Sequence, residues 1–110
     1  MNQVNGSNNE LNFNWRYGDY ALEACPARLV RLSDNEPNTT IDFVKYYHQG
    51  NKEYKYSIGY FYYNTNEPCW ELKFVGDRFT EIFDTDVAVV FRMLKAAYET
   101  LTEWSERGEQ

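Results

Sequence analysis

The stretch that decides the fold is residues 54–63, which read Tyr-Lys-Tyr-Ser-Ile-Gly-Tyr-Phe-Tyr-Tyr. Side chains on a strand alternate between the two faces of a sheet, and aromatic side chains suit a pleated surface better than a helix. We therefore predict a central strand here. One face would carry Tyr54, Tyr56, Ile58, Tyr60 and Tyr62, whereas Phe61 and Tyr63 would point to the other face.

Apolar and polar residues also alternate before and after this run, which predicts further strands. The turn signals between them are Gly18-Asp19, the loop 33–38, residues 49–52, the segment 64–68 and Gly76-Asp77. A short helical turn over 22–27 is an alternative to part of the second strand. The predicted strands are 11–17, 20–25 with an extended continuation over 27–32, 39–48, 70–74 and a short last strand at 79–83.

The periodicity changes near Asp84, where apolar residues begin to recur at three- and four-residue steps up to Trp104. We predict one helix over 84–106, with Asp84, Thr85 and Asp86 at its N-terminus and Gly108 beyond its end. Strands that precede a single helix favour an α+β fold. The expected architecture is an antiparallel meander of about five or six strands, with the helix packed across one face.

The chain has 110 residues, 43% of them hydrophobic and 18% aromatic, so we expect one globular domain over 10–110 after a disordered tail at 1–9. The net charge is −6, and residues 77–110 hold eight acidic against four basic residues. This acidity argues against a nucleic-acid backbone or an anionic membrane as partner. No long apolar run or signal-peptide pattern occurs, so we expect a cytoplasmic protein.

Cys25 and Cys69 could form a disulfide or supply a reactive thiol. A cytoplasmic compartment instead favours two reduced, half-buried side chains, which is the reading we adopt. The sequence contains no phosphate-binding loop, dinucleotide fingerprint or Cys-x-x-Cys motif, and we expect no cofactor.

Several residues are of types that catalytic or metal-binding sites use. His48 is the single histidine and lies at a predicted hairpin, where a solvated turn residue is expected. Glu81, Asp84 and Asp86 could ligate a hard cation, but the glycine that a calcium loop requires at its sharp turn is missing. Capping of the predicted helix explains Asp84 and Asp86 without a metal. Glu71 and Lys73, with Asp42 as a third member, superficially match a metal-dependent nuclease, but alternating charges on a wet face explain them better. We assign no catalytic, cofactor or metal residue, although an unrecognised carboxylate site remains an alternative.

The tyrosine run also invites comparison with the aromatic motif of RNA-recognition domains, in which rings on a sheet stack on bases. The glycine and basic pattern of that motif is missing, and the three lysines Lys45, Lys52 and Lys55 give only a small positive cluster. Binding of single-stranded nucleic acid is therefore an alternative function rather than the preferred one.

Three segments, 41–47, 56–61 and 70–78, resemble small uncharacterised accessory proteins of phages and prophages of Gram-positive bacteria. The resemblance covers about 40 residues in the middle of the chain and carries over no catalytic or binding residue. It implies an accessory protein that acts on a host or phage macromolecule.

The aromatic excess predicts a function in protein binding, because tyrosine and tryptophan are common anchors at interfaces. We expect an acid-flanked aromatic sheet face that contacts a second copy of the chain or inhibits a basic, nucleic-acid-handling protein. The candidate partner contacts are Phe61, Tyr63, Tyr47 and Trp70.

Overall fold

The computed structural model describes residues 11–26 and 39–106. It contains five strands, a 3₁₀ helix and one α-helix. The predicted tail at 1–9 and the extended continuation at 27–32 lie outside the described residues. The elements are β1 (Asn14–Tyr17), β2 (Tyr20–Pro26), β3 (Thr39–Gln49), β4 (Lys52–Asn64), β5 (Cys69–Phe74), η2 (Arg78–Asp84) and α1 (Val87–Glu106).

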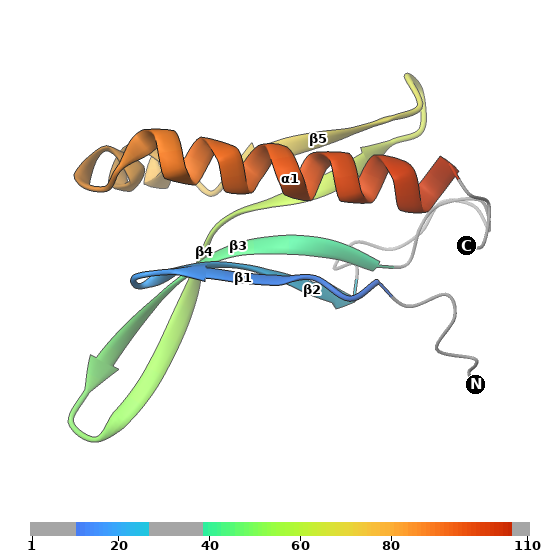
Figure 1. Cartoon of the computed structure of the whole chain (residues 1–110). Helices are drawn as coiled ribbons and strands as arrows, with labels where there is room; N and C mark the ends of the chain where they lie inside the picture. Colours follow the sequence, from blue (N-terminus) through green and yellow to red (C-terminus); the bar gives the residue numbers. More distant parts are fainter. Residues whose placement is uncertain (1–10, 27–38, 107–110) are drawn as a thin grey trace.

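The strands form one antiparallel sheet in the order β1-β2-β3-β4-β5, so the predicted α+β meander with a long C-terminal helix is confirmed. Gly18 and Gly50 have positive φ values of 59° and 66°, which glycine adopts without steric cost, and each closes a two-residue hairpin turn. The β3–β4 hairpin extends beyond the helix, whereas β5 and the second half of β4 run beside it (Figure 1).

A β-bulge in β4 changes which residues face the helix. Phe43 lies opposite Gly59, but the next residue of β3, Val44, lies opposite Ser57, so Ile58 is an extra residue in β4. Two consecutive positions, Ile58 and Gly59, therefore lie on the core side, and the alternation changes phase after them. The chain bends at this point (Figure 1).

The bulge corrects the predicted faces of the tyrosine strand. Phe61 lies on the same face as Tyr56 and Ile58, is only 3% exposed and belongs to the core cluster. Tyr60 and Tyr62, which strict alternation places beside Ile58, lie on the opposite face. The expectation that Phe61 and Tyr63 point away from the helix-covered face is wrong.

The core lies between α1 and one face of the sheet. The helix contributes six residues that recur at helical spacing: Val90, Met93, Leu94, Ala97, Leu101 and Trp104. From the sheet the core receives Tyr20, Leu22, Ile41, Phe43, Ile58, Phe61 and Trp70.

The start of α1 differs slightly from the prediction. The helix begins at Val87, and the carboxylate of Asp86 accepts hydrogen bonds from the backbone N–H groups of Ala88 (3.1 Å) and Val89 (3.4 Å). Asp86 is therefore the N-cap, as its side-chain chemistry predicts. Asp84 ends η2 instead of capping α1, so the predicted helix began too early.

The predicted short strand at 79–83 is wrong, because these residues form part of η2. Side chains fix this segment to the sheet. Tyr20 donates to the Glu81 carbonyl oxygen (3.1 Å), Tyr56 donates to Glu81 Oε1 (2.5 Å), and Lys45 Nζ lies 3.6 Å from the same oxygen. Burial and the bond to Glu81 raise the pKa of Tyr56, which keeps the phenol a donor.

Candidate functional site

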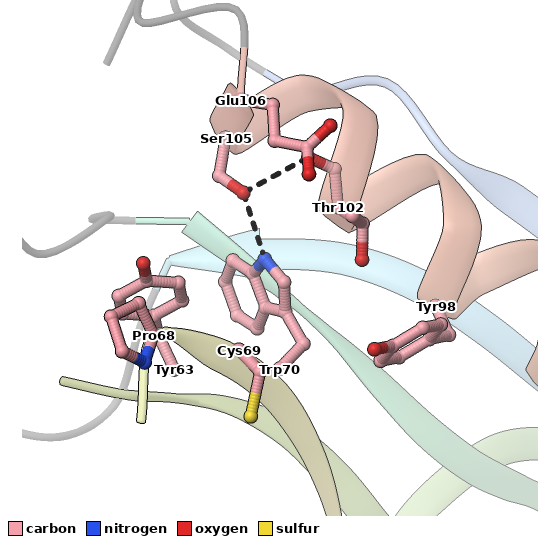
Figure 2. A pocket seen from close by; sticks show the side chains of 8 residues that line it. All are labelled: Tyr63, Pro68, Cys69, Trp70, Tyr98, Thr102, Ser105 and Glu106. Atoms are coloured by element: carbon pink, nitrogen blue, oxygen red, sulfur yellow. Dashed lines mark hydrogen bonds between the residues drawn. The ribbon is translucent and has the colours of Figure 1, made fainter. Parts of the chain in front are cut away.

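A pocket of about 370 Å³ opens between the end of α1 and the β4–β5 hairpin. Its volume falls in the range of small ligand sites. Figure 2 shows the side chains that line it: Tyr63, Pro68, Cys69, Trp70, Tyr98, Thr102, Ser105 and Glu106. The sheet and the helix both contribute, so the packing of α1 on the sheet builds the pocket.

Aromatic rings form much of the pocket wall. Tyr63 and Trp70 are directly opposite each other on β4 and β5, and their rings meet edge to face at a centroid distance of 5.4 Å. Trp70 is held in place by its indole N–H, which donates to Ser105 Oγ (3.1 Å), while Ser105 Oγ donates to the Leu101 carbonyl oxygen (3.0 Å). Tyr98 comes from α1 and is 41% exposed. On the sheet side, ring contact and a hydrogen bond hold Trp70 in place, whereas Tyr98 on the helix side is partly exposed to solvent.

The polar part of the wall is acidic. Glu106 is the one charged side chain among the lining residues, and the last turn of α1 contains no basic residue. The C-terminal end of a helix carries partial negative charge on its carbonyl groups, which adds to the charge of Glu106. In the described part of the chain, the buried hydroxyl of Thr102 has no hydrogen-bond partner. The pocket therefore combines aromatic surface with negative potential.

Exposed aromatic side chains continue along the β5 side of the molecule. Phe91 and Tyr98 are seven residues apart, so they lie on the same side of α1, about 10 Å apart along its axis. Phe79 is exposed and packs edge to face against Phe74 of β5 at a centroid distance of 5.8 Å. We call Phe74, Phe79, Phe91, Tyr98 and the pocket together the β5-edge surface. Within the described sheet, β5 has a strand neighbour on one side only.

Of the four predicted partner contacts, Tyr63 and Trp70 are brought together, whereas Phe61 and Tyr47 lie elsewhere. Phe61 is a core residue, and Trp70 is only 4% exposed, so neither offers a free aromatic face as predicted. Tyr63 and Trp70 both line the pocket (Figure 2). Tyr47 lies in the projecting hairpin and stacks on Tyr54 at 5.6 Å. Tyr98 and Glu106 complete the pocket, but no short-range pattern in the sequence connects them with residues 63–70.

The β3–β4 hairpin carries the cluster of lysines that suggested nucleic-acid binding. Glutamates pair with two of the three lysines: Lys55 Nζ lies 2.8 Å from Glu23 and Lys45 Nζ lies 3.6 Å from Glu81. Glu53, on the same hairpin, also pairs with Arg16 (3.1 Å). Little net positive charge is left beside the Tyr47–Tyr54 pair for a phosphate backbone.

The face of the sheet away from α1 carries Glu71, Lys73 and Asp42, for which the sequence predicts alternating charges on a wet face instead of a nuclease site. Glu71 accepts hydrogen bonds from Tyr62 (2.9 Å) and Asn64 (2.9 Å), and the bonds from Asn64 and Tyr62 lower the pKa of Glu71. Lys73 Nζ lies 4.3 Å from the ring centroid of Tyr62. Asp42 is on β3, one strand further away, so β4 separates it from Glu71. Glu71 and Lys73 of β5 therefore interact with side chains of β4.

Two further observations concern metals and membranes. Within residues 11–26 and 39–106, no three His, Cys, Asp or Glu side chains gather closely enough to hold a metal ion. In the same ranges, no helix has the length and apolar character needed to cross a bilayer.

The two cysteines are half-buried, and neither forms a disulfide in the described structure. We expect freshly purified protein, prepared without reductant, to contain two alkylatable thiols per chain after unfolding in denaturant. Mass spectrometry of the alkylated chain measures this number directly. A chain that is two daltons lighter and resists alkylation would contradict the expectation and place the protein in an oxidising compartment.

Comparisons with protein-family models, with curated proteins and with solved structures found no match.

Proposed function

We propose that this protein is a small acidic binding module without enzymatic activity, which acts by holding another protein on its β5-edge surface. The observation that carries the proposal is the presence of the exposed rings of Phe79, Phe91 and Tyr98 on the two elements that follow β5, with Tyr98 also lining an acid-flanked pocket. Contiguous exposed apolar surface on a small soluble domain commonly marks an interaction site.

The position of the surface suggests how the partner binds. A terminal strand can accept an additional extended strand through main-chain hydrogen bonds, and neighbouring pockets then select side chains of that strand. β5 is such a strand, and its aromatic neighbours Phe79 and Tyr98 come from η2 and α1 on the same side of the molecule. We therefore propose that the bound segment is extended and runs along β5.

Charge favours a basic partner over a second copy of the chain. The net charge of −6 makes two copies repel each other, and the acidity is concentrated in residues 77–110, which form η2, α1 and the residues after them. The same charge steers a basic protein toward this side and speeds the encounter. A nucleic-acid-handling protein has such a basic surface, and occupation of that surface would inhibit it.

A phage or prophage context is part of the proposal. The resemblance of residues 41–78 to accessory proteins of phages and prophages of Gram-positive bacteria is consistent with a small protein that binds and inhibits a host or phage target. On this proposal the protein acts in the cytoplasm, where such targets are found.

The proposal is tested by sedimentation and by capture from a host lysate. We expect a monomer of about 13 kDa at micromolar concentration, the mass of one chain, and a captured basic protein whose recovery falls at least about fivefold in Tyr98→Ser. Loss of a central aromatic anchor commonly weakens an interface by about 2 kcal/mol or more. That free energy corresponds to a loss of affinity of about 30-fold, which is more than the fivefold fall expected here.

Tyr54→Ser is the matched control, because Tyr54 is 40% exposed against 41% for Tyr98 but lies in the β3–β4 hairpin. Recovery with Tyr54→Ser should equal that of the wild type. A dimer of about 26 kDa that Tyr98→Ser dissociates would make the partner a second copy. Equal recovery with both variants from a monomer would contradict binding at the β5-edge surface.

A further inference from the structure

We infer that the pocket at the end of α1 binds the guanidinium group of an arginine side chain in the partner. This inference rests on the proposed binding at the β5-edge surface and adds the chemistry of the anchor residue.

The aromatic wall suits a planar cation. Cations are attracted to the faces of aromatic rings, and arginine stacks on them more readily than lysine does because its charged group is flat and weakly hydrated. Tyr98 presents a ring that is 41% exposed at one side of the pocket, and Trp70, which Tyr63 meets edge to face, lies across from it (Figure 2). A guanidinium in the pocket would stack on the exposed part of the Tyr98 ring, with Tyr63 and the mostly buried Trp70 as apolar neighbours.

The polar wall suits a group that only donates hydrogen bonds. A guanidinium has five N–H donors and no acceptor, and it forms paired hydrogen bonds with a carboxylate. Glu106 offers that carboxylate, and within the described residues it has no ion-pair partner. Thr102 also lines the pocket, and its buried hydroxyl has no hydrogen-bond partner among the described residues. The lining residues include no cation to compete with the ligand.

The experiment is a titration of ¹⁵N-labelled protein with N-acetyl-arginine amide, followed by NMR. We expect the indole N–H signal of Trp70 to shift and saturate with a dissociation constant in the millimolar range, typical of a single side chain. The indole of Trp15, on β1, should stay unchanged. N-acetyl-citrulline amide, which has nearly the same shape without charge, should not bind. Equal responses to the two compounds, or no saturation, would overturn the inference.

Two charge-removing variants test the role of Glu106. Glu106→Gln should weaken binding of the arginine compound about threefold to tenfold, the range for a partly exposed charged hydrogen bond. Glu99→Gln removes the same charge from the same helix, but Glu99 lies outside the pocket and pairs with Lys95 (4.0 Å), so binding should be unchanged. Equal weakening in both variants would mean that only overall charge matters, which contradicts the site. Equal affinity for N-acetyl-lysine amide would contradict the choice of guanidinium.

Arginines of the chain itself are an alternative occupant. Arg28, Arg31 and Arg107 lie outside the described residues. Binding of the arginine compound should be the same in the wild type and in a variant that carries Arg28→Gln, Arg31→Gln and Arg107→Gln. If binding appears only in the variant, the pocket is already filled by the chain and the inference is wrong.

Failure of the inference can be separated from failure of the proposed function. If capture of the host protein depends on Tyr98 but no arginine compound saturates the pocket, the β5-edge surface binds its partner in another way. If the arginine compound binds as described but capture is unaffected by Tyr98→Ser, the pocket is real and the proposed function is wrong.

Discussion

Replacing Phe61 with alanine is expected to lower the free energy of unfolding by about 3–5 kcal/mol, the range for removing a buried phenylalanine ring. The reason is the position of Phe61 after the bulge. It is 3% exposed, pairs with Leu72 across β4 and β5, and belongs to the cluster that α1 covers. Its removal leaves a cavity between the helix and the sheet.

Tyr62→Ala is the matched control for this prediction. Tyr62 is the next residue, loses a ring of similar size, and faces away from α1, where its hydroxyl donates to Glu71. We expect a clearly smaller loss than for Phe61→Ala, because only one exposed hydrogen bond and modest cross-strand packing are removed. Chemical denaturation of the two variants measures the difference. A larger loss for Tyr62 than for Phe61 would mean that β4 alternates without a bulge.

The sequence predicts the fold well because the spacing of apolar residues follows the face of each strand or helix that is buried. The alternation at 70–74 and the helical stripe ending at Trp104 each reflect one face buried against another element, whereas 39–48 is predicted from its β-branched and aromatic residues. The failure at 79–83 has a tertiary cause. Residues 79–83 are apolar enough for a strand, but contacts of Glu81 with Tyr56 and Lys45 hold them in a 3₁₀ helix. Those contacts are long-range and leave no trace in the local pattern.

The candidate site was predictable only in part. Their aromatic character alone predicts Tyr63 and Trp70, the two aromatic sheet residues of the pocket, as partner contacts. Strict alternation, however, places Tyr63 on the sheet face opposite Ile58, which is the wrong face. A signal for the bulge was present, since an isolated glycine such as Gly59 in a strand pattern often marks one. Tyr98 and Glu106 reach the pocket through the packing angle of α1 on the sheet. A single sequence does not specify that angle.

Gly59 itself gives the second large prediction. An alanine Cβ at this position would lie 2.6 Å from the carbonyl oxygen of Lys73 and 3.3 Å from the Cα of Phe74. Both atoms belong to the backbone of β5, so no side-chain rotation relieves the clash, and β5 has to move away from β4. We expect Gly59→Ala to lower the free energy of unfolding by about 3 kcal/mol, the upper part of the usual range for overpacking.

Gly50→Ala separates this clash from the general effect of replacing a glycine. Gly50 has a φ of 66° and no heavy atom within 4 Å of a built Cβ, so its replacement costs only the left-handed backbone conformation, about 1 kcal/mol. Denaturation gives the two losses, and amide hydrogen exchange locates them. In Gly59→Ala, exchange at 69–74 should accelerate more than exchange in β1 and β2, because the displaced strand is β5. Equal losses for the two variants, with unchanged exchange at 69–74, would mean that β5 does not approach the bulge as closely as the structure describes.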